Sequence, residues 1–126
     1  MKNKLILSPL NHTWFIDIDG TIFKHNGYKI DGYDSLLPGV KEFFSKIPKG
    51  DLVILVTSRT NEYKDLTIKS LEDNDVRFDT IIFNSPYGER IVINDDKLSG
   101  LKTGKCINIK RDEGLENILL EIDKDL

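Results

Sequence analysis

The chain has 126 residues. That length suffices for one domain, which buries about two-thirds of its unfolded surface in a core. Its 18 basic and 21 acidic residues leave a net charge of −3, which excludes the basic surface that nucleic acids and anionic membranes require. We therefore expect a small molecule or another protein as the partner.

The single cysteine, Cys106, excludes an internal disulfide and fits a reducing compartment. It lies in the apolar run KCINI, so we interpret it as a buried structural thiol. The apolar stretch at residues 5–7 is too short for a secretory leader, and no segment is long enough to span a membrane. These features predict a cytoplasmic protein without a membrane partner.

Apolar runs bounded by polar residues predict five strands that alternate with helices. The strands are expected over residues 12–19, 51–58, 79–83, 90–94 and 105–109. Amphipathic patterns predict helices over 38–47, 60–74 and 111–126. Alternating strands and helices, with nearly continuous apolar strands, are typical of a parallel sheet covered on both faces. The sequence thus predicts one α/β domain over residues 1–126, a Rossmann-like three-layer sandwich with a mostly parallel five-stranded sheet.

Polar side chains end three of these strands. The first ends in Asp17-Ile18-Asp19-Gly20-Thr21, the second in Thr57-Ser58-Arg59 and the fourth in Asn94-Asp95-Asp96. Ligands of parallel sheets bind beyond the carboxyl ends of the strands, so we expect these residues to converge. Four carboxylates would repel one another without a cation, and oxygen ligands without clustered histidine or cysteine favour Mg²⁺. Such a site is typical of phosphoryl transfer.

Asp19-Gly20 between apolar runs also fits a β-hairpin. A hairpin explains neither Asp17 among apolar neighbours nor the acids after the fourth strand. Thr57 alone would be a routine strand end, and Asp95-Asp96 alone a solvated turn. Their order along the chain therefore favours a functional site.

The segments FIDIDGT, LVILVTS and IVINDD, in this order, resemble three motifs of the haloacid dehalogenase superfamily of phosphohydrolases. The resemblance spans residues 12–109, and GERIVINDDKLSGLK at 88–102 is similar to small members linked to surface-polysaccharide or capsule biosynthesis. It implies a Mg²⁺-dependent phosphomonoesterase that acts through an aspartyl phosphate. A sugar phosphate of surface-polysaccharide biosynthesis is a candidate substrate.

The resemblance also implies roles for individual residues. Asp17 would be the nucleophile, Asp19 the general acid and then the base, and Thr57 a hydrogen-bonding partner of the phosphoryl group. The implied metal ligands are Asp17, Asp19, Asp95 and Asp96. The expected substrate-binding residues are Gly20, Thr21, Ser58 and Arg59, although Arg59 fits a surface charge at the start of a helix equally well.

The chain departs from the family pattern in its third motif, which is usually a lysine before the acidic pair. No lysine lies between Lys69 and that pair. Arg90 is our first candidate for this catalytic charge, Arg59 the second and Lys97 the third.

The chain also leaves no room for a cap domain after the first motif. Residues 20–37 suffice only for a flap, with Gly27 and Gly32 as expected turns. Its aromatic residues Phe23, Tyr28 and Tyr33 are candidate substrate or packing contacts. A capless site is open, so the substrate is large or a second copy of the chain forms the lid in a homo-oligomer.

Two other function classes stay open. A receiver signalling domain has a similar fold and acidic cluster, but its phosphoacceptor ends the third strand, where IIFNSP has no aspartate. A non-catalytic binding or assembly module is the other alternative. It would have no need of both Asp17 and Asp19.

Overall fold

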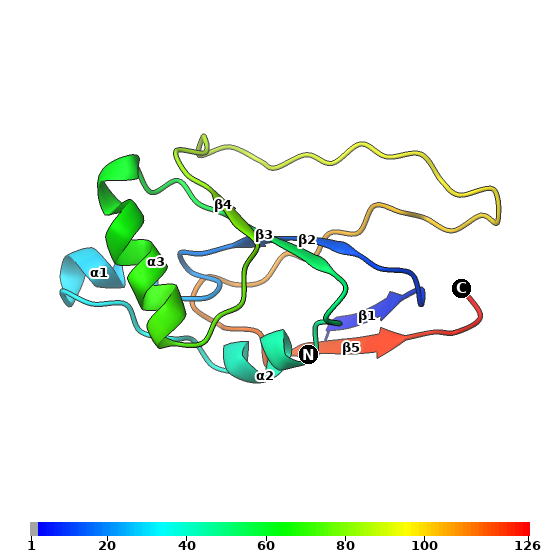
Figure 1. The fold of residues 1–126 in the computed structure, drawn as a ribbon, viewed down its shortest axis with the longest axis horizontal. Coiled ribbons are helices and arrows are strands. Elements are labelled where there is room, and N and C mark those ends of the chain that lie inside the picture. The colour runs from blue at the N-terminus through cyan, green and yellow to red at the C-terminus, as the bar shows by residue number, and fades with distance from the viewer. Residues whose placement is uncertain (1–2) are drawn as a thin grey trace.

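The computed structural model describes residues 3–126 and shows a mixed α/β protein with parallel strands (Figure 1). Its strands are β1 (Asn3–Leu7), β2 (Thr13–Asp17), β3 (Leu52–Val56), β4 (Thr80–Ile82) and β5 (Ile118–Ile122). Its helices are α1 (Gly27–Ile30), α2 (Val40–Ser45) and α3 (Lys64–Asp73), and the 3₁₀ turn η1 (Asn61–Tyr63) precedes α3. No helix within residues 3–126 is long and apolar enough to cross a membrane.

β2, β3 and β4 form a parallel three-stranded sheet in that order. Its register places Phe15 opposite Ile54 and Asp17 opposite Val56. Helices lie in both crossovers, as parallel strands require. Three expected strands are therefore confirmed within narrower bounds, and so are the helices expected over 38–47 and 60–74.

The two faces of this sheet differ in burial. Ile16, Val53 and Leu55 belong to the core that α2 and α3 complete, and each is at most 8% exposed. On the opposite face Phe15 is 56% exposed and Ile82 47% exposed. Within the described residues, helices thus pack on one face only, instead of forming the expected three-layer sandwich.

β1 and β5 form a separate two-stranded parallel sheet, with Asn3 opposite Ile118. The expected single five-stranded sheet is therefore wrong, as is the helix expected over 111–126. Gly114 has a φ of +85°, and a Cβ at this position would collide with the Pro38 carbonyl oxygen, so the chain needs glycine here and its conformation ends any helix. The residues beyond it pair with β1 instead.

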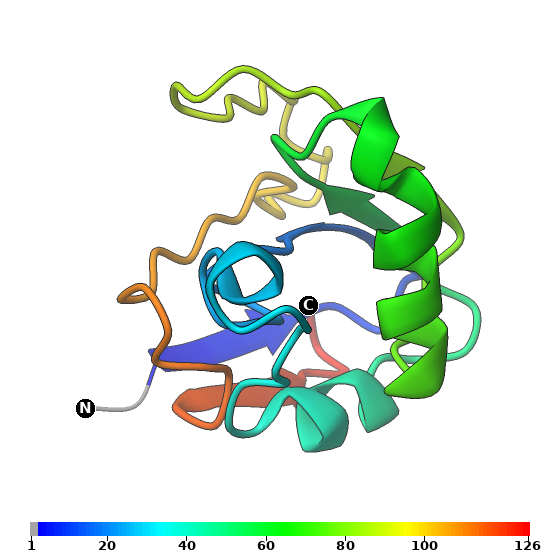
Figure 2. The same ribbon diagram turned by 90° about the vertical axis from the view of Figure 1, so that its left-hand side faces the viewer.

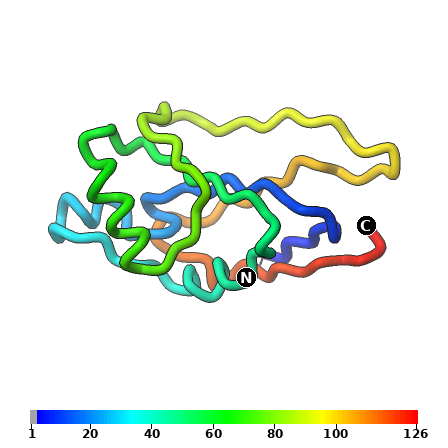
Figure 3. The backbone as a smooth tube through the Cα atoms, viewed as in Figure 1, coloured from blue at the N-terminus to red at the C-terminus, as the bar shows by residue number. Residues whose placement is uncertain are grey.

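The segment between β4 and β5 corrects two further expectations. Residues 90–94 and 105–109 form no strand, and Ile91 and Ile93 are exposed. Figures 1 and 3 show the chain leaving β4, running along the molecule and turning back where Gly100 N–H donates to the Lys97 carbonyl. Cys106, which we expected to be buried, is exposed on the returning stretch. Residues with high β propensity do not form a strand unless a neighbouring strand pairs with them through backbone hydrogen bonds.

The flap at residues 20–37 contains α1, which faces the viewer in Figure 2. The backbone of Phe23 forms isolated β-bridges with Asp19 and Leu36. Its side chain is fully buried and packs in the core. Tyr33 is 64% exposed. Gly32 has a φ of +83°, which fits the turn expected there.

Asp51 anchors the start of β3 to β2. Its fully buried carboxylate lies 2.7 Å from His12 Nδ1 and accepts hydrogen bonds from Trp14 Nε1 at 2.8 Å and His12 N–H at 3.1 Å. Burial acts to raise the pKa of Asp51, but these hydrogen bonds outweigh it and hold the pKa below its ordinary value. Asp51 therefore stabilises the fold in its ionised form.

We expect Asp51→Ala to lower the free energy of unfolding by about 2–4 kcal/mol, because it leaves buried donors unpaired. Since folding lowers the pKa, the stabilisation is complete above the ordinary carboxyl pKa of about 4 and is lost as the pH falls further. Urea denaturation between roughly pH 5 and pH 3 should therefore show a shallower loss of stability in Asp51→Asn than in the wild type. An equal acid sensitivity in both would refute this role.

Candidate functional site

Asp17 and Asp19 lie at the carboxyl end of β2 beside a cavity of about 270 Å³. Gly20 has a φ of +84°, and the N–H groups of Ile22 and Phe23 both donate to the Ile18 carbonyl, so the chain folds back directly after the two acids. The cavity is lined by Asp17, Asp19, Gly20, Thr21, Ile109 and Arg111. Four of the predicted site residues therefore meet at one cavity.

The two oxygens of Asp17 each accept one hydrogen bond. Thr21 Oγ1 donates to Oδ2 at 3.0 Å, and Arg90 Nη1 donates to Oδ1 at 2.8 Å. The side chains of Asp17 and Arg90 are 34% and 39% exposed, and such pairs are worth only about 0–1 kcal/mol. A phosphate group could therefore take over the Arg90 contact at little cost, and Asp17 remains accessible to a ligand.

Arg59 is buried between β3 and the flap, with 1% of its side chain exposed. It donates to both oxygens of Asp19 at 2.9–3.3 Å, to both oxygens of Asp34 at 2.8 and 3.1 Å, and to Thr67 Oγ1 at 3.0 Å. These contacts use all five guanidinium N–H groups. The surface-charge interpretation of Arg59 is therefore wrong, and in this arrangement no donor is left for a substrate.

Arg59 thus ties the flap to the central sheet. Its Cζ lies 3.9 Å from the centre of the Tyr28 ring, and Tyr28 in turn packs edge-on against Tyr63. Burial opposes the charge of Arg59, but the hydrogen bonds to Asp19 and Asp34 outweigh it and raise the pKa of the guanidinium above its ordinary value. Of the two roles expected for Tyr28, substrate contact or packing contact, the structure shows packing.

Thr57 and Ser58 lie between β3 and Arg59. Thr57 is 1% exposed, and its Oγ1 accepts a hydrogen bond from Arg59 N–H at 3.0 Å. The hydroxyl therefore shapes the turn that directs Arg59 toward Asp19. Neither Thr57 nor Ser58 lines the cavity.

Asp95, Asp96 and Lys97 lie in the exposed segment that leads away from the strand ends (Figure 1). Asp96 pairs with Lys102 at 2.7 Å, and the Asp95 carbonyl accepts a hydrogen bond from Thr103. Within residues 3–126 no three acidic, histidine or cysteine side chains gather closely enough to hold a metal ion. The structure thus does not bring this pair together with Asp17 and Asp19.

The cavity includes two residues that the sequence analysis did not name, Ile109 and Arg111. Their segment docks on the start of the flap, where Asp112 N–H donates to the Gly20 carbonyl at 2.9 Å and His25 N–H donates to Asp112 Oδ1 at 2.8 Å. The sequence predicted a strand that ends at Ile109, but no motif there indicated a site residue. Only the folded chain reveals their position.

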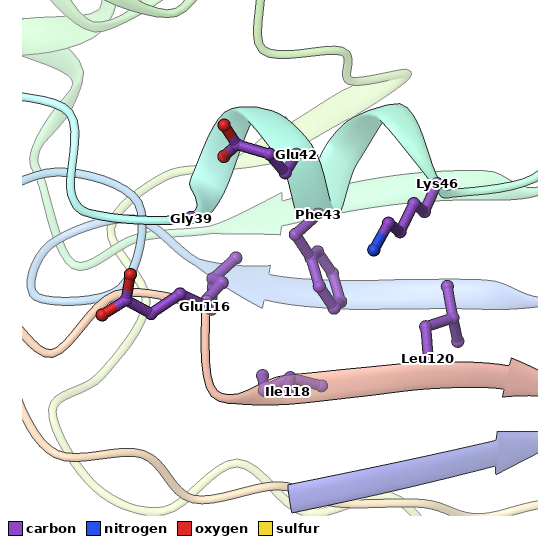
Figure 4. Close-up of a pocket in the computed structure, with 8 residues that line it drawn as sticks. Gly39, Glu42, Phe43, Lys46, Glu116, Ile118 and Leu120 are labelled. Atoms are coloured by element: carbon purple, nitrogen blue, oxygen red, sulfur yellow. The ribbon is translucent and has the colours of Figure 1, made fainter. Parts of the chain in front are cut away.

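A second cavity, of about 350 Å³, lies between α2 and β5. Figure 4 shows Phe43 above Ile118 and Leu120, with Glu42 and Glu116 toward one end and Lys46 toward the other. It contains none of the predicted site residues. We therefore place the candidate site at the end of β2.

Comparisons of the chain with protein-family models, curated proteins and solved structures find no match.

The donors beside the cavity fit Mg²⁺ shared with a phosphate. Mg²⁺ at phosphoryl-transfer sites is held by one or two carboxylates together with substrate oxygens and water. Asp17 provides a carboxylate beside the cavity, and no softer ligand lines it. Asp17 would hold the ion through this carboxylate, and Asp19 would hold it through its backbone carbonyl, because the carboxyl group of Asp19 serves as acid and base.

Proposed function

We propose that the protein is a Mg²⁺-dependent phosphomonoester hydrolase of the haloacid dehalogenase type. One observation carries the proposal: at the end of the edge strand β2, the accessible carboxylate of Asp17 lies beside a cavity, with Arg90 bonded to it at 2.8 Å. A nucleophilic carboxylate next to a guanidinium suits attack on an anionic phosphate. The ordered motifs at residues 15–21, 52–58 and 91–96 add support from the sequence.

In the first step an oxygen of Asp17 attacks phosphorus, and the ester P–O bond breaks. Asp19 gives its proton to the leaving oxygen. Arg90 moves its hydrogen bond from Asp17 to the phosphoryl oxygens, so that its charge stays next to the charge that develops. Bound Mg²⁺ would supply neutralisation of the phosphate charge in this step.

In the second step water attacks the phosphorus of the aspartyl phosphate. Asp19 takes the proton from this water, the bond between phosphorus and Asp17 breaks, and inorganic phosphate leaves. Arg59 holds Asp19 in place through both carboxylate oxygens. Oδ2 accepts only the Nε bond at 3.0 Å, so this oxygen has capacity left for a proton.

Phosphate release from a generic aryl phosphate tests the proposal, with and without Mg²⁺. A panel of phosphorylated sugars and nucleotides follows, with sugar phosphates first because of the resemblance of residues 88–102. We expect turnover that stops on chelation and returns when Mg²⁺ is restored. No turnover on any of these substrates would refute the hydrolase proposal.

A non-catalytic binding module is a second candidate, favoured by the position of Asp95 and Asp96 outside the cavity. Such a module would bind a phosphorylated ligand at the same cavity without releasing phosphate. Calorimetry with the same panel separates the two, because a module shows binding without turnover.

A further inference from the structure

The geometry points to Arg111 as the residue that binds the substrate's phosphate group at this cavity. This inference rests on the proposed function, which it extends by assigning a substrate-binding residue. Arg111 lines the same cavity as Asp17, Asp19 and Thr21, although it lies at least ninety residues away from them in sequence.

The fold holds the backbone of Arg111 against the turn after the two acids. Its neighbour Asp112 has a φ of +65° and is fixed by the two hydrogen bonds to Gly20 and His25 described above. Arg111 Cγ lies only 3.1 Å from the position that a Cβ on Gly20 would occupy. Glycine at this position therefore permits the close approach that places Arg111 beside the catalytic turn.

The charges around the cavity leave Arg111 available for an anion. Arg59 pairs with Asp19 and Asp34, and Arg90 pairs with Asp17. Within residues 3–126 no carboxylate lies within ion-pair distance of Arg111, which is exposed. Among the described residues that line the cavity, Arg111 is thus a cation that pairs with no carboxylate.

Arg111 also sets the net charge that a substrate meets. Without it, the carboxylates of Asp17, Asp19 and Asp34 outnumber the guanidinium groups of Arg59 and Arg90, and the excess negative charge would repel a phosphate. Arg111 raises the number of guanidinium groups to three, equal to the number of these three carboxylates. A guanidinium offers paired N–H donors that match phosphate oxygens, so phosphate is the ligand chemistry that it fits best.

This role predicts a loss of binding rather than of chemistry. Arg111 contacts the phosphate before and during the reaction, so its removal should raise KM with little change in kcat. Losing one charge-assisted hydrogen-bonding group corresponds to about a tenfold to hundredfold weaker affinity.

The test compares the wild type with Arg111→Gln, Arg111→Lys and the control Lys110→Gln, in the presence of Mg²⁺. Isothermal calorimetry measures Kd for inorganic phosphate, and steady-state assays measure KM and kcat on the aryl phosphate. We expect Kd and KM to rise about tenfold to hundredfold in Arg111→Gln and less in Arg111→Lys, with kcat within about threefold. The control removes an adjacent exposed charge outside the cavity and should match the wild type.

The outcomes separate this inference from the proposed function. If the wild type turns over and Arg111→Gln keeps the wild-type Kd and KM, the role of Arg111 is refuted and the hydrolase stands. A fall in kcat at constant KM would also refute a binding role. If the wild type binds phosphate through Arg111 but hydrolyses nothing, the hydrolase fails and the binding site stands. If it neither binds nor hydrolyses, both fail.

Discussion

Changing Asp17 to asparagine should lower kcat for phosphate release by at least about a thousandfold. The amide is neutral and a poor nucleophile, so no aspartyl phosphate forms at this position. The side chain is 34% exposed at the end of β2, and asparagine keeps its size and one acceptor oxygen, which suffices for the hydrogen bond from Thr21. The hydrogen bond from Arg90 that is then lost belongs to an exposed pair and contributes only about 0–1 kcal/mol. We therefore expect the variant to fold with nearly unchanged stability, so that the loss reflects chemistry.

Asp73→Asn is the matched control for this change. Asp73 ends α3 and is 61% exposed beside Lys69, so the same acid-to-amide change occurs away from the cavity. Asp17→Asn and Asp73→Asn should be purified in the same way and compared with the wild type in single-turnover assays. Residual turnover of Asp17→Asn above about a tenth of the wild type would show that another group attacks phosphorus.

Changing Arg59 to methionine should lower the free energy of unfolding by about 3–5 kcal/mol. The change leaves Asp34, which is 1% exposed, without a partner for its buried charge, and Asp19 loses three hydrogen bonds. It also removes the stacking on Tyr28 and frees the flap from β3. Urea denaturation measures the loss.

Arg90→Met is the control, because it removes the same side chain from a carboxylate at the surface. That pair is more than a third exposed on each side and should contribute only about 0–1 kcal/mol. Equal stability of the two variants would contradict a stabilising role for the buried ion pairs of Arg59 with Asp19 and Asp34. Loss of activity without loss of stability in Arg90→Met would instead support its contact with the phosphate.

Much of the central sheet could be predicted from the sequence, because its signals are local. The apolar runs of β2 and β3 stand between polar residues, and the glycine after Asp19 marks the turn. The choice of Arg90 as the first candidate beside Asp17 agrees with the observed hydrogen bond. Its catalytic role stays a prediction.

The rest of the fold depends on contacts between distant segments. β1 and β5 lie at opposite ends of the chain, and each lacks a local signal of its partner. Residues 90–94 have the composition of a strand but no ladder, and residues 118–122 have helical spacing but pair with β1. Side-chain pattern alone cannot decide these cases, because pairing supplies the stabilisation.

The environments of two arginines at the site could not be predicted from the sequence either. Arg59 follows a strand end, as a substrate contact would, but its environment depends on Asp34 from the flap. Arg111 reaches the cavity only because the segment before β5 docks on Gly20. Neither arrangement is visible in residue spacing.

The most direct test of phosphoryl transfer through Asp17 is chemical trapping during turnover. Borohydride added to protein, Mg²⁺ and aryl phosphate reduces an aspartyl phosphate to homoserine, which peptide mass spectrometry locates. We expect homoserine at position 17 only when substrate is present, together with release of inorganic phosphate. Phosphate release with no modification at position 17, or modification at another residue, would contradict the mechanism; trapping at Asp17 without release would indicate a phosphoacceptor domain instead.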